Sequence, residues 1–389
     1  MSFQVIVKSI LHLFKESVEY NLDEVLPQFN LPPVTGSAFT QARYKIHSDF
    51  FQYMERIVVK HYLQIKKRLW KGHRLIGVDG STLNLPPTKD IIEHFGIRAQ
   101  NNMGIKRSIA RVSFFYDLLN DFVVENELTP TKEGEKVHFL KGLNRIDDLN
   151  DIYILDRGYG HYNTVLELIN RKKLFCIRFP SCSNFISSIL SNKKKDMIIE
   201  WSPSNKEKEN CKKQGLIPKT IKVRVTKIVL KTGEIEVLIS NLMNTSKYSH
   251  GDLKWIYNKR WVVEEGFKKL KPKMKVEYFG ARKTAGVYQE YYAHVFIMNI
   301  IAFFTMICDK KLEQKLKSRK YKYKSNWQNA YRITRTSLIQ ILSIRFDEYK
   351  LETLITRISY STIPIIPNKS SPRDMRHANK KGRISHYYK

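Results

Sequence analysis

The order of patterns along the chain predicts a mixed α/β fold, in which helices flank a sheet of parallel and antiparallel strands. Three observations support this prediction. Short apolar runs without a helical repeat occupy the middle of the 389-residue chain, and two of them are joined as a hairpin. Apolar residues at helical spacing come before and after these runs. We therefore expect an α/β domain at residues 71–309, between a helical region at 1–70 and a basic region at 310–389.

The first 70 residues predict two groups of helices. Apolar residues fall at helical spacing in both groups, at Ile6, Ile10, Leu13 and Phe14 and again at Phe50, Met54 and Val58. The segment Leu31-Pro-Pro-Val-Thr-Gly separates the groups, since proline and glycine favour a turn. This region is interpreted either as a small DNA-binding bundle or as packing scaffold.

Two predicted strands end in an aspartate. Arg74-Leu-Ile-Gly-Val-Asp79 is followed by Gly, and Asp151-Ile-Tyr-Ile-Leu-Asp156 has a Gly two residues further on. Between them, 108–117 and 122–128 predict a hairpin around a Leu-Leu-Asn-Asp turn. A helix is predicted near 161–171. Each strand is thus expected to present an aspartate at its carboxyl end.

The next stretch, from about 174 to 244, is rich in predicted strands. It contains a second hairpin, formed by 220–230 and 234–242 around Lys231-Thr-Gly. The polar, Lys-rich segment 192–219 is predicted to be a loop, and helical spacing resumes from Leu253. Residues 368–389 are polar and basic, and a loose tail is expected there.

The charge of the chain indicates a polyanionic partner. Lys and Arg number 68 against 37 Asp and Glu, which gives a formal net charge of +31. Residues 310–389 hold 20 of the basic and 5 of the acidic side chains, about half of the excess. Nucleic acid is the polyanion that usually neutralises such a charge, and an anionic membrane is the weaker candidate. A soluble tail, or a Lys-rich composition without a partner, is the alternative.

Several other classes of protein are disfavoured. The four cysteines form no Cys-x-x-Cys pair, and the histidines show no metal-ligand spacing, so zinc is not expected. Few cysteines, an N-terminus without a secretory pattern and an apolar run at 295–308 too short to cross a bilayer favour a cytoplasmic, non-membrane protein. The chain has no G-x-x-x-x-G-K-[ST] loop, so ATP-driven chemistry is not indicated.

A polar face is predicted on the helix from about 249 to 275. At about 100° per residue, four side chains fall within a sector of about 60°. They are Tyr257, Arg260, Glu264 and Lys271. An adjacent apolar stripe would press the helix onto the sheet, and it consists of Ile256, Val263, Phe267 and Leu270. An ordinary amphipathic helix with an Arg260–Glu264 charge pair would show the same pattern.

Asp79, Asp156 and Glu264 together form a candidate set of oxygen ligands. A strand-end aspartate is more often a turn or capping residue, so neither aspartate is informative alone. Two of them with a helix-borne glutamate, on a basic protein, suit Mg²⁺, which takes few carboxylates and leaves positions for phosphate oxygens. Two such ions can support in-line displacement at phosphorus.

The helix carries a recognisable signature. Tyr257-Asn-Lys-Arg260-Trp-Val-Val-Glu264 and Lys271 match Y-x2-R-x3-E-x6-K at all four positions. The chain here resembles the insertion-sequence transposases of family four, a bacterial branch of the DDE transposases. Asp79-Gly-Ser-Thr resembles the first acidic motif of that family, and Leu155-Asp156-Arg-Gly-Tyr159 resembles the second. The resemblance runs from about residue 35 to 300.

The resemblance implies an RNase H-like fold, with a mixed five-stranded sheet and helices on both faces. In that fold the first Asp lies on the first strand, the second on the fourth, and the Glu on a later helix. The gap of 108 residues between Asp156 and Glu264 is long for such a core. The family fills this gap with a β-rich insertion, which corresponds to the strands predicted at about 174–244.

The resemblance also implies roles for the residues. Asp79, Asp156 and Glu264 would be catalytic and would bind two Mg²⁺ or Mn²⁺ ions, whereas Tyr257, Arg260 and Lys271 would contact DNA phosphates. The implied partners are the transposon's terminal repeats and target DNA, held by a homodimer in a synaptic complex. Family members that form a hairpin intermediate hold a flipped base with a Trp about 28 residues before the Glu, and this chain has none there. A nuclease without strand transfer and an inactive or domesticated DNA-binding derivative are the alternatives.

Overall fold

The structure is a computed structural model that describes residues 1–12, 17–100, 106–146, 150–180, 184–230, 232–315, 318–342 and 347–366. The tail predicted at 368–389 and the helical positions Leu13 and Phe14 lie outside these ranges. Packing divides the chain into two compact units. Unit 1 contains Met1–Glu55 and Lys273–Lys389, and unit 2 contains Arg56–Pro272. This division does not coincide with the boundaries predicted at 70/71 and 309/310.

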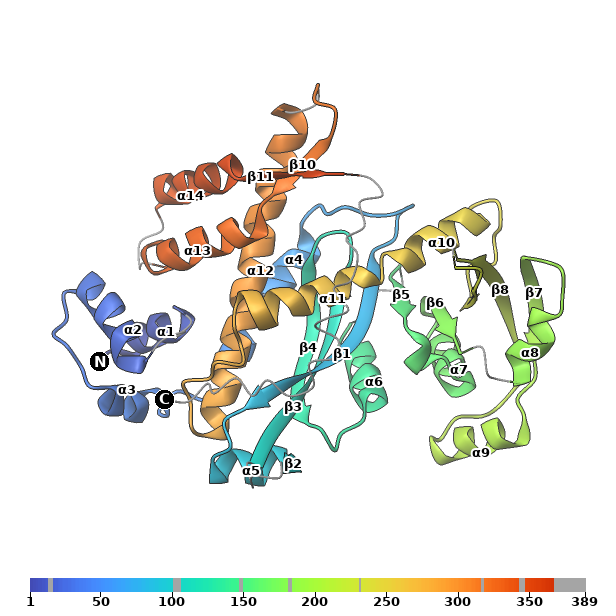
Figure 1. Ribbon diagram of the computed structural model, residues 1–389, viewed down its shortest axis with the longest axis horizontal. Coiled ribbons are helices and arrows are strands. Elements are labelled where there is room, and N and C mark those ends of the chain that lie inside the picture. Colours follow the sequence, from blue (N-terminus) through green and yellow to red (C-terminus); the bar gives the residue numbers. More distant parts are fainter. Residues whose placement is uncertain are drawn as a thin grey trace. The chain divides into compact units, whose positions relative to one another are not determined.

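Unit 2 contains one continuous sheet of nine strands (Figure 1). They are β1 (Leu75–Leu85), β2 (Ile97–Gln100), β3 (Lys106–Asp117), β4 (Phe122–Pro130), β5 (Ile152–Leu155), β6 (Leu174–Phe179), β7 (Asp196–Trp201), β8 (Ile221–Val229) and β9 (Ile235–Ser240). The order is β2-β3-β1-β5-β6-β9-β8-β7, and β4 pairs with β3. Strands β1, β5 and β6 run parallel, and the other pairs are antiparallel.

The expected five-stranded sheet with a β-rich insertion is not confirmed in that form, because the sheet has nine strands. Strand β9 pairs antiparallel with β6, so the strands of the predicted insertion extend the same sheet. The hairpins predicted at 108–128 and 220–242 are confirmed as β3–β4 and β8–β9. The loop predicted at 192–219 is wrong, because it contains β7 and helix α9 (Asn205–Lys213). A capping box between Ser204 and Glu207 starts helix α9. The helix consists mostly of charged and polar residues, so the spacing of apolar residues did not predict it.

The other helices of unit 2 are α5 (Lys89–Phe95), α6 (Glu135–Arg145), α7 (Tyr162–Asn170), α8 (Asn184–Leu190), α10 (His250–Asn258) and α11 (Trp261–Lys268). Helices α6 and α11 lie on opposite faces of the sheet. A side chain at Gly142 of α6 would strike Phe115, and one at Gly266 of α11 would strike Tyr116. Since successive residues of a strand point to opposite faces, these two contacts place the helices on different sides of β3.

Unit 1 is mainly helical. Its helices are α1 (Phe3–Leu11), α2 (Val18–Val25), α3 (Gly36–Arg43), α12 (Thr284–Lys315), α13 (Trp327–Ile341) and α14 (Glu348–Tyr360), with short strands β10 (Lys322–Ser325) and β11 (Thr362–Ile365). Helix α4 (Phe50–Gln64) crosses the division between the units. The helices predicted in the first 70 residues are thus confirmed wherever the structure describes them.

Both ends of the chain contribute to unit 1, and buried polar contacts join them. Arg43 at the end of α3 donates to Glu290 of α12 at 2.7 Å and to Gln289 at 3.2 Å. The side-chain amide of Gln289 in turn donates to the backbone oxygens of Arg43 and Ile46. These groups are almost fully buried, so each charge depends on its partner.

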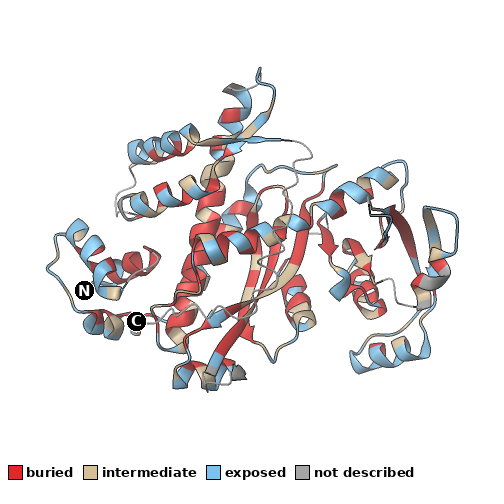
Figure 2. Ribbon diagram, in the orientation of Figure 1, coloured by how far each residue is buried: buried red, intermediate tan, exposed pale blue. Residues whose placement is uncertain are grey.

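Helix α12 is the most apolar long helix of unit 1. By length and composition alone, Thr284–Gln314 could cross a membrane, but 78% of its most apolar window is buried inside the protein. Figure 2 shows this helix largely in the colour of buried residues. The buried helix predicted at 295–308 is therefore confirmed, and it extends further in both directions.

Candidate active site

Asp79 and Asp156 lie at the same level of two neighbouring parallel strands. Val78 of β1 is paired with Leu155 of β5, and each aspartate is the next residue of its chain. Asp156 follows the end of β5, as predicted. Asp79 does not end its strand, because β1 continues to Leu85 by pairing with β3. The aspartate instead marks the point where parallel pairing with β5 stops.

The segment predicted as one helix at 249–275 is broken. Helix α10 ends at Asn258, a turn follows at Lys259 and Arg260, and α11 runs from Trp261 to Lys268. A π-helical turn at Lys269–Lys273 contains Pro272, which cannot donate a helical hydrogen bond. The sector of about 60° assumed a straight helix and therefore does not describe this geometry.

The four polar side chains nevertheless lie near the end of β5 and the middle of β1. Tyr257 Oη donates to Asp156 Oδ1 at 3.4 Å. Arg260 bridges two carboxylates, with Nη1 at 3.6 Å from Asp79 Oδ2 and Nη2 at 2.8 Å from Glu264 Oε1. Lys271 Nζ donates to the backbone oxygen of Thr82 at 2.7 Å and to Ser81 Oγ at 3.2 Å. One guanidinium thus connects Glu264 to Asp79.

Apolar contacts hold this segment on the sheet. The predicted stripe of Ile256, Val263, Phe267 and Leu270 is buried, as expected. Phe267 stacks on Phe114 of β3, with 4.5 Å between the ring centroids. Gly266 allows the close approach, since a Cβ there would lie 2.9 Å from the Tyr116 ring. The helix is therefore fixed at a short distance from the strands that carry Asp79.

The carboxylates influence one another electrostatically. Burial raises the pKa of Asp79 to about 6, and the negative charges of Glu264 and Asp156 add to that rise. The Gly80 N–H and Arg260 lower it in part. Burial raises the pKa of the Tyr257 phenol, and the charge of Asp156 raises it further. The phenol is thus a hydrogen-bond donor at neutral pH, which suits contact with a phosphate and not attack as a nucleophile.

Further charged residues lie at this site, and the sequence analysis did not single them out. Arg178 of β6 and Glu236 of β9 form an ion pair at 3.0 Å, and both charges act on the Tyr257 phenol. Glu135 at the start of α6 forms an ion pair with Arg111. A Cβ added at Gly80 would lie 2.9 Å from the Glu135 carboxylate. The strand from Leu174 was predicted, but the place of Arg178 beside Asp156 depends on strand register, which the sequence does not show.

The donor set fits a hard divalent cation in its chemistry. Three carboxylates approach one region, and the pKa of Asp79 is raised first by burial and then by the charges of Glu264 and Asp156. In the described ranges, no three His, Cys, Asp or Glu side chains form a ready metal-binding group. Glu264 is occupied by Arg260 here, so metal binding requires that contact to change.

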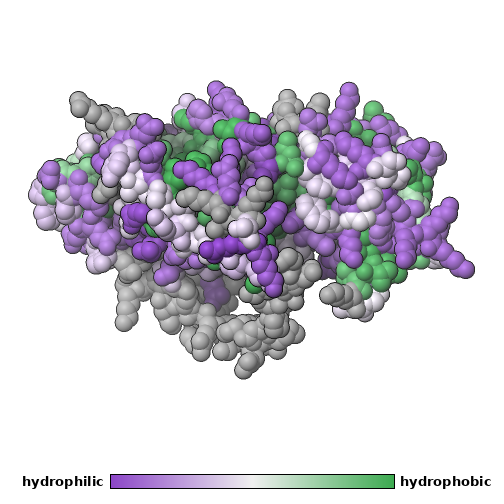
Figure 3. All heavy atoms as spheres, turned by 90° about the horizontal axis from the view of Figure 1, so that it is seen from above, coloured by the Kyte–Doolittle hydropathy of each residue, from purple (hydrophilic) through white to green (hydrophobic). Residues whose placement is uncertain are grey.

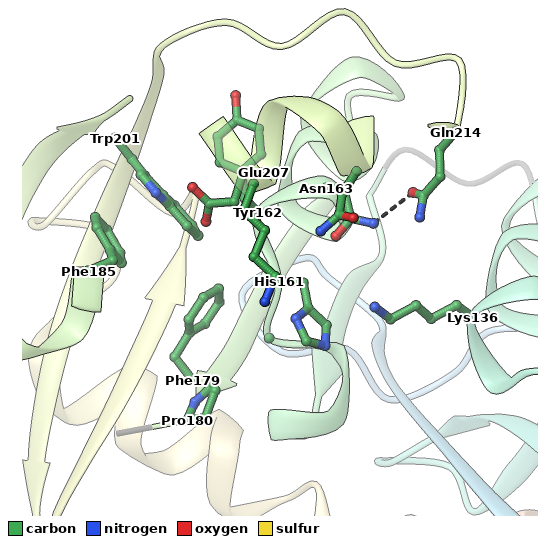
Figure 4. A pocket seen from close by; sticks show the side chains of 13 residues that line it. Lys136, His161, Tyr162, Asn163, Phe179, Pro180, Phe185, Trp201, Glu207 and Gln214 are labelled. Carbon is green, nitrogen blue, oxygen red and sulfur yellow. Dashed lines mark hydrogen bonds between the residues drawn. The ribbon is translucent and has the colours of Figure 1, made fainter. Parts of the chain in front are cut away.

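A cavity of about 450 Å³ lies beside the loop that follows Asp156 (Figure 4). Gly160 and His161 line it on one side, and the Trp201 ring, stacked 4.1 Å from that of Phe185, lines it on another. Gly160 admits no side chain, because a Cβ would lie 2.9 Å from the backbone oxygen of Arg178. None of the three carboxylates lines the cavity, so it is a separate feature from their site.

Carboxylates close to phenol and guanidinium groups are typical of enzymes that act on phosphodiesters. Comparison with known families then identifies the chain. Residues 70–300 match the family model described as "Transposase DDE domain", and the chain belongs to this family. It is a transposase, an enzyme that cleaves DNA and transfers the cut strand.

No curated protein matches the chain. A similar solved structure is "Cryo-EM structure of piggyBac transposase synaptic complex with hairpin DNA", which has 11% sequence identity and a TM-score of 0.47. The match covers 97% of this chain and 80% of that chain.

Proposed function

We propose that Asp79, Asp156 and Glu264 are the catalytic carboxylates and that they hold two divalent metal ions, Mg²⁺ or Mn²⁺. The observation that carries this proposal is that Arg260 joins Glu264 to Asp79, while Tyr257 of the same segment donates to Asp156. When bound, such ions activate the attacking oxygen and stabilise the leaving oxygen in an in-line displacement at phosphorus.

The neighbouring side chains would bind the DNA backbone. Tyr257 donates one hydrogen bond, Lys271 contributes a point charge, and Arg260 can bind a phosphate through two parallel N–H bonds. Arg260 now contacts Asp79 and Glu264. Exchange of these carboxylates for a phosphate would leave their oxygens free for metal ions, so DNA and metal binding would support each other.

The strand order supports an RNase H-like core. Strands β4-β3-β1-β5-β6 place two antiparallel strands on one side of β1 and two parallel strands on the other. Strands β7, β8 and β9 would then be the β-rich insertion. With the Y-x2-R-x3-E-x6-K signature, this order supports the bacterial insertion-sequence transposases of family four.

The partners follow from the same proposal. The enzyme would bind the terminal inverted repeats of its element and then target DNA, as a homodimer in a synaptic complex in the bacterial cytoplasm. Residues 1–70 or the basic residues 310–389 would read the DNA ends. Hydrophilic side chains cover much of the face that Figure 3 shows.

A pair of adjacent glutamates provides the test. Glu264→Gln keeps the shape of the side chain but removes its charge, so it should abolish metal-dependent cleavage while DNA binding remains. Glu265→Gln is the matched control, because Glu265 is bound to Lys268 on the exposed face. The measurement is cleavage and joining of DNA that carries the element's ends, with Mg²⁺ or Mn²⁺ in the buffer.

Each outcome separates the candidates. Loss of cutting and joining in Glu264→Gln alone supports the proposed site. Retained cleavage in Glu264→Gln excludes Glu264 as the third carboxylate. Cutting without joining by the unmodified protein indicates a nuclease, and binding without cutting indicates an inactive derivative.

A further inference from the structure

We propose that a row of stacked aromatic rings beside α10 binds unpaired nucleotides of a DNA strand. The aromatic row consists of Tyr248, Trp70 and Trp255. Bases would stack on its exposed end, and Lys259 would bind a backbone phosphate there. The inference goes beyond the proposed catalytic site, because none of these residues belongs to the carboxylates or to the Y-x2-R-x3-E-x6-K signature.

The three rings are close to parallel, and they differ in exposure. The Trp70 ring stacks with both of the others, at 5.8 Å between its centroid and that of Tyr248 and at 6.1 Å from that of Trp255. The interplanar angles are 28° and 17°. Tyr248 is buried, Trp70 is half-buried and Trp255 is 41% exposed. A base that stacks on Trp255 would therefore extend a row of rings that already exists.

Hydrogen bonds fix the aromatic row in the absence of a ligand. Trp70 and His73 exchange two backbone hydrogen bonds of 2.8 Å across a turn at 71–72, where both φ angles are positive. Tyr248 Oη lies 2.7 Å from Nε2 of His73, so the ring of Tyr248 is tied to the same turn. The rings are thus preorganised, and little conformational freedom is lost when a base stacks on them.

Each ring of the aromatic row has a lysine ammonium within 5.2 Å of its centroid. The three lysines are Lys247 at Tyr248, Lys71 at Trp70 and Lys259 at Trp255. Asp252 pairs with Lys71 at 2.5 Å, whereas Lys259 forms no ion pair within the described ranges. Since its stem is flexible, the Lys259 ammonium can move from the indole to a phosphate when a base takes its place. Aromatic faces beside positive charge are the combination that binds single-stranded nucleic acid.

An unpaired strand suits this surface better than a duplex does. Bases inside a duplex are stacked on one another, whereas an unpaired base offers a free face to a protein ring. A cut strand can leave its complement near the cut, so unpaired nucleotides arise in the reaction of a transposase. Trp255 is two residues before Tyr257, which donates to Asp156. At about 100° per residue the two rings point in different directions, so the aromatic row is a separate surface on the same helix.

Packing of the turn at 71–72 against α10 is the competing explanation for the aromatic row. Such packing needs a bulky apolar side chain at position 255, but it does not need an aromatic ring. Trp255→Leu keeps an apolar side chain and removes the ring, whereas Trp255→Phe keeps a ring. The two variants therefore separate stacking of bases from packing of the fold, and the thermal unfolding of each variant checks that it is folded.

The experiment measures the affinity of the full chain for two single strands of about 10 nucleotides, without metal. One strand is oligothymidylate, and the other is abasic at every position, so it keeps the phosphates and lacks the bases. The unmodified protein should bind oligothymidylate at least about fivefold more tightly than the abasic strand. Trp255→Leu should lose this preference, and Trp255→Phe should keep most of it.

Lys259→Gln tests the phosphate contact separately. It should reduce the slope of log affinity against log salt by about 0.7 for both strands, because one contact with a single strand is lost. Lys89→Gln is the control, since Lys89 is 92% exposed on α5, and it should leave the slope unchanged. Equal binding of the two strands by the unmodified protein, or an unchanged preference in Trp255→Leu, would overturn the proposal. An equal loss of affinity for a duplex in Trp255→Leu would also overturn it. These readouts need no cleavage, so they are independent of the Glu264→Gln result.

Discussion

Asp79 is an acid in surroundings that disfavour its charge. Burial and the nearby Glu264 and Asp156 carboxylates raise its pKa to about 6. The folded protein therefore holds this proton more tightly than the unfolded chain does. The resulting stabilisation is complete below about pH 4 and is lost as the pH rises through about 6. At neutral pH without metal, the ionised Asp79 thus lowers the free energy of unfolding.

Asp79→Asn should accordingly stabilise the metal-free protein while it abolishes cleavage. At pH 7.5 with a chelator, the free energy of unfolding should rise by about 1–3 kcal/mol. The gain should disappear near pH 4, where Asp79 is protonated. Urea unfolding at both pH values measures this difference.

The control for Asp79→Asn has the opposite sign. Hydrogen bonds and an ion pair with Lys71 lower the pKa of Asp252, so Asp252→Asn should destabilise the protein at pH 7.5. If Asp79→Asn also destabilises the protein at pH 7.5, the electrostatic description of the site is wrong.

At the scale of the elements, sequence patterns predicted most of the strands and the residues of the site. Both hairpins and the helix after Asp156 follow from apolar periodicity and turn residues. That argument failed in two places. Helix α9 buries Cys211 but has almost no apolar stripe, and the break between α10 and α11 involves Lys259 and Arg260, which both favour helix.

The register between strands was also beyond the sequence argument. The alternation of residues shows which side chains share a face of one strand, but it does not show which residues of two strands lie side by side. The alignment of Asp79, Asp156 and Arg178 on the neighbouring strands β1, β5 and β6 depends on that pairing. Arg178 was therefore missed, although its own strand was predicted.

The loop between β5 and α7 provides a prediction about one element. A Cβ added at Gly160 would lie 2.9 Å from the backbone oxygen of Arg178 and 3.1 Å from that of Arg157. A Cβ added at Gly158 would meet no atom within 4 Å. Gly160→Ala should destabilise the protein by about 1–3 kcal/mol, because backbone must shift. Gly158→Ala should change stability by less than about 0.5 kcal/mol. Chemical denaturation of the two variants tests this contrast, and equal effects would contradict it.

For the whole molecule, a net charge of +31 predicts strongly salt-dependent DNA binding. If six or more phosphates are neutralised, affinity should fall by about a thousandfold or more between 50 and 200 mM salt. Fluorescence anisotropy with a labelled duplex, repeated at several salt concentrations, measures the slope. A nearly constant affinity would show that the positive charge does not serve to bind DNA.

The pairing of Arg43 with Glu290 also has a consequence for the order of events on the ribosome. The two residues are 247 positions apart, so at 5–20 residues per second Glu290 is synthesised roughly 12–50 s after Arg43. Until Glu290 has been synthesised, the Arg43 guanidinium lacks the carboxylate with which it is buried in the folded protein. Residues 56–272, which form the other compact unit, are synthesised within this interval. The ion pair that joins α3 to α12 can therefore form only after translation has passed Glu290.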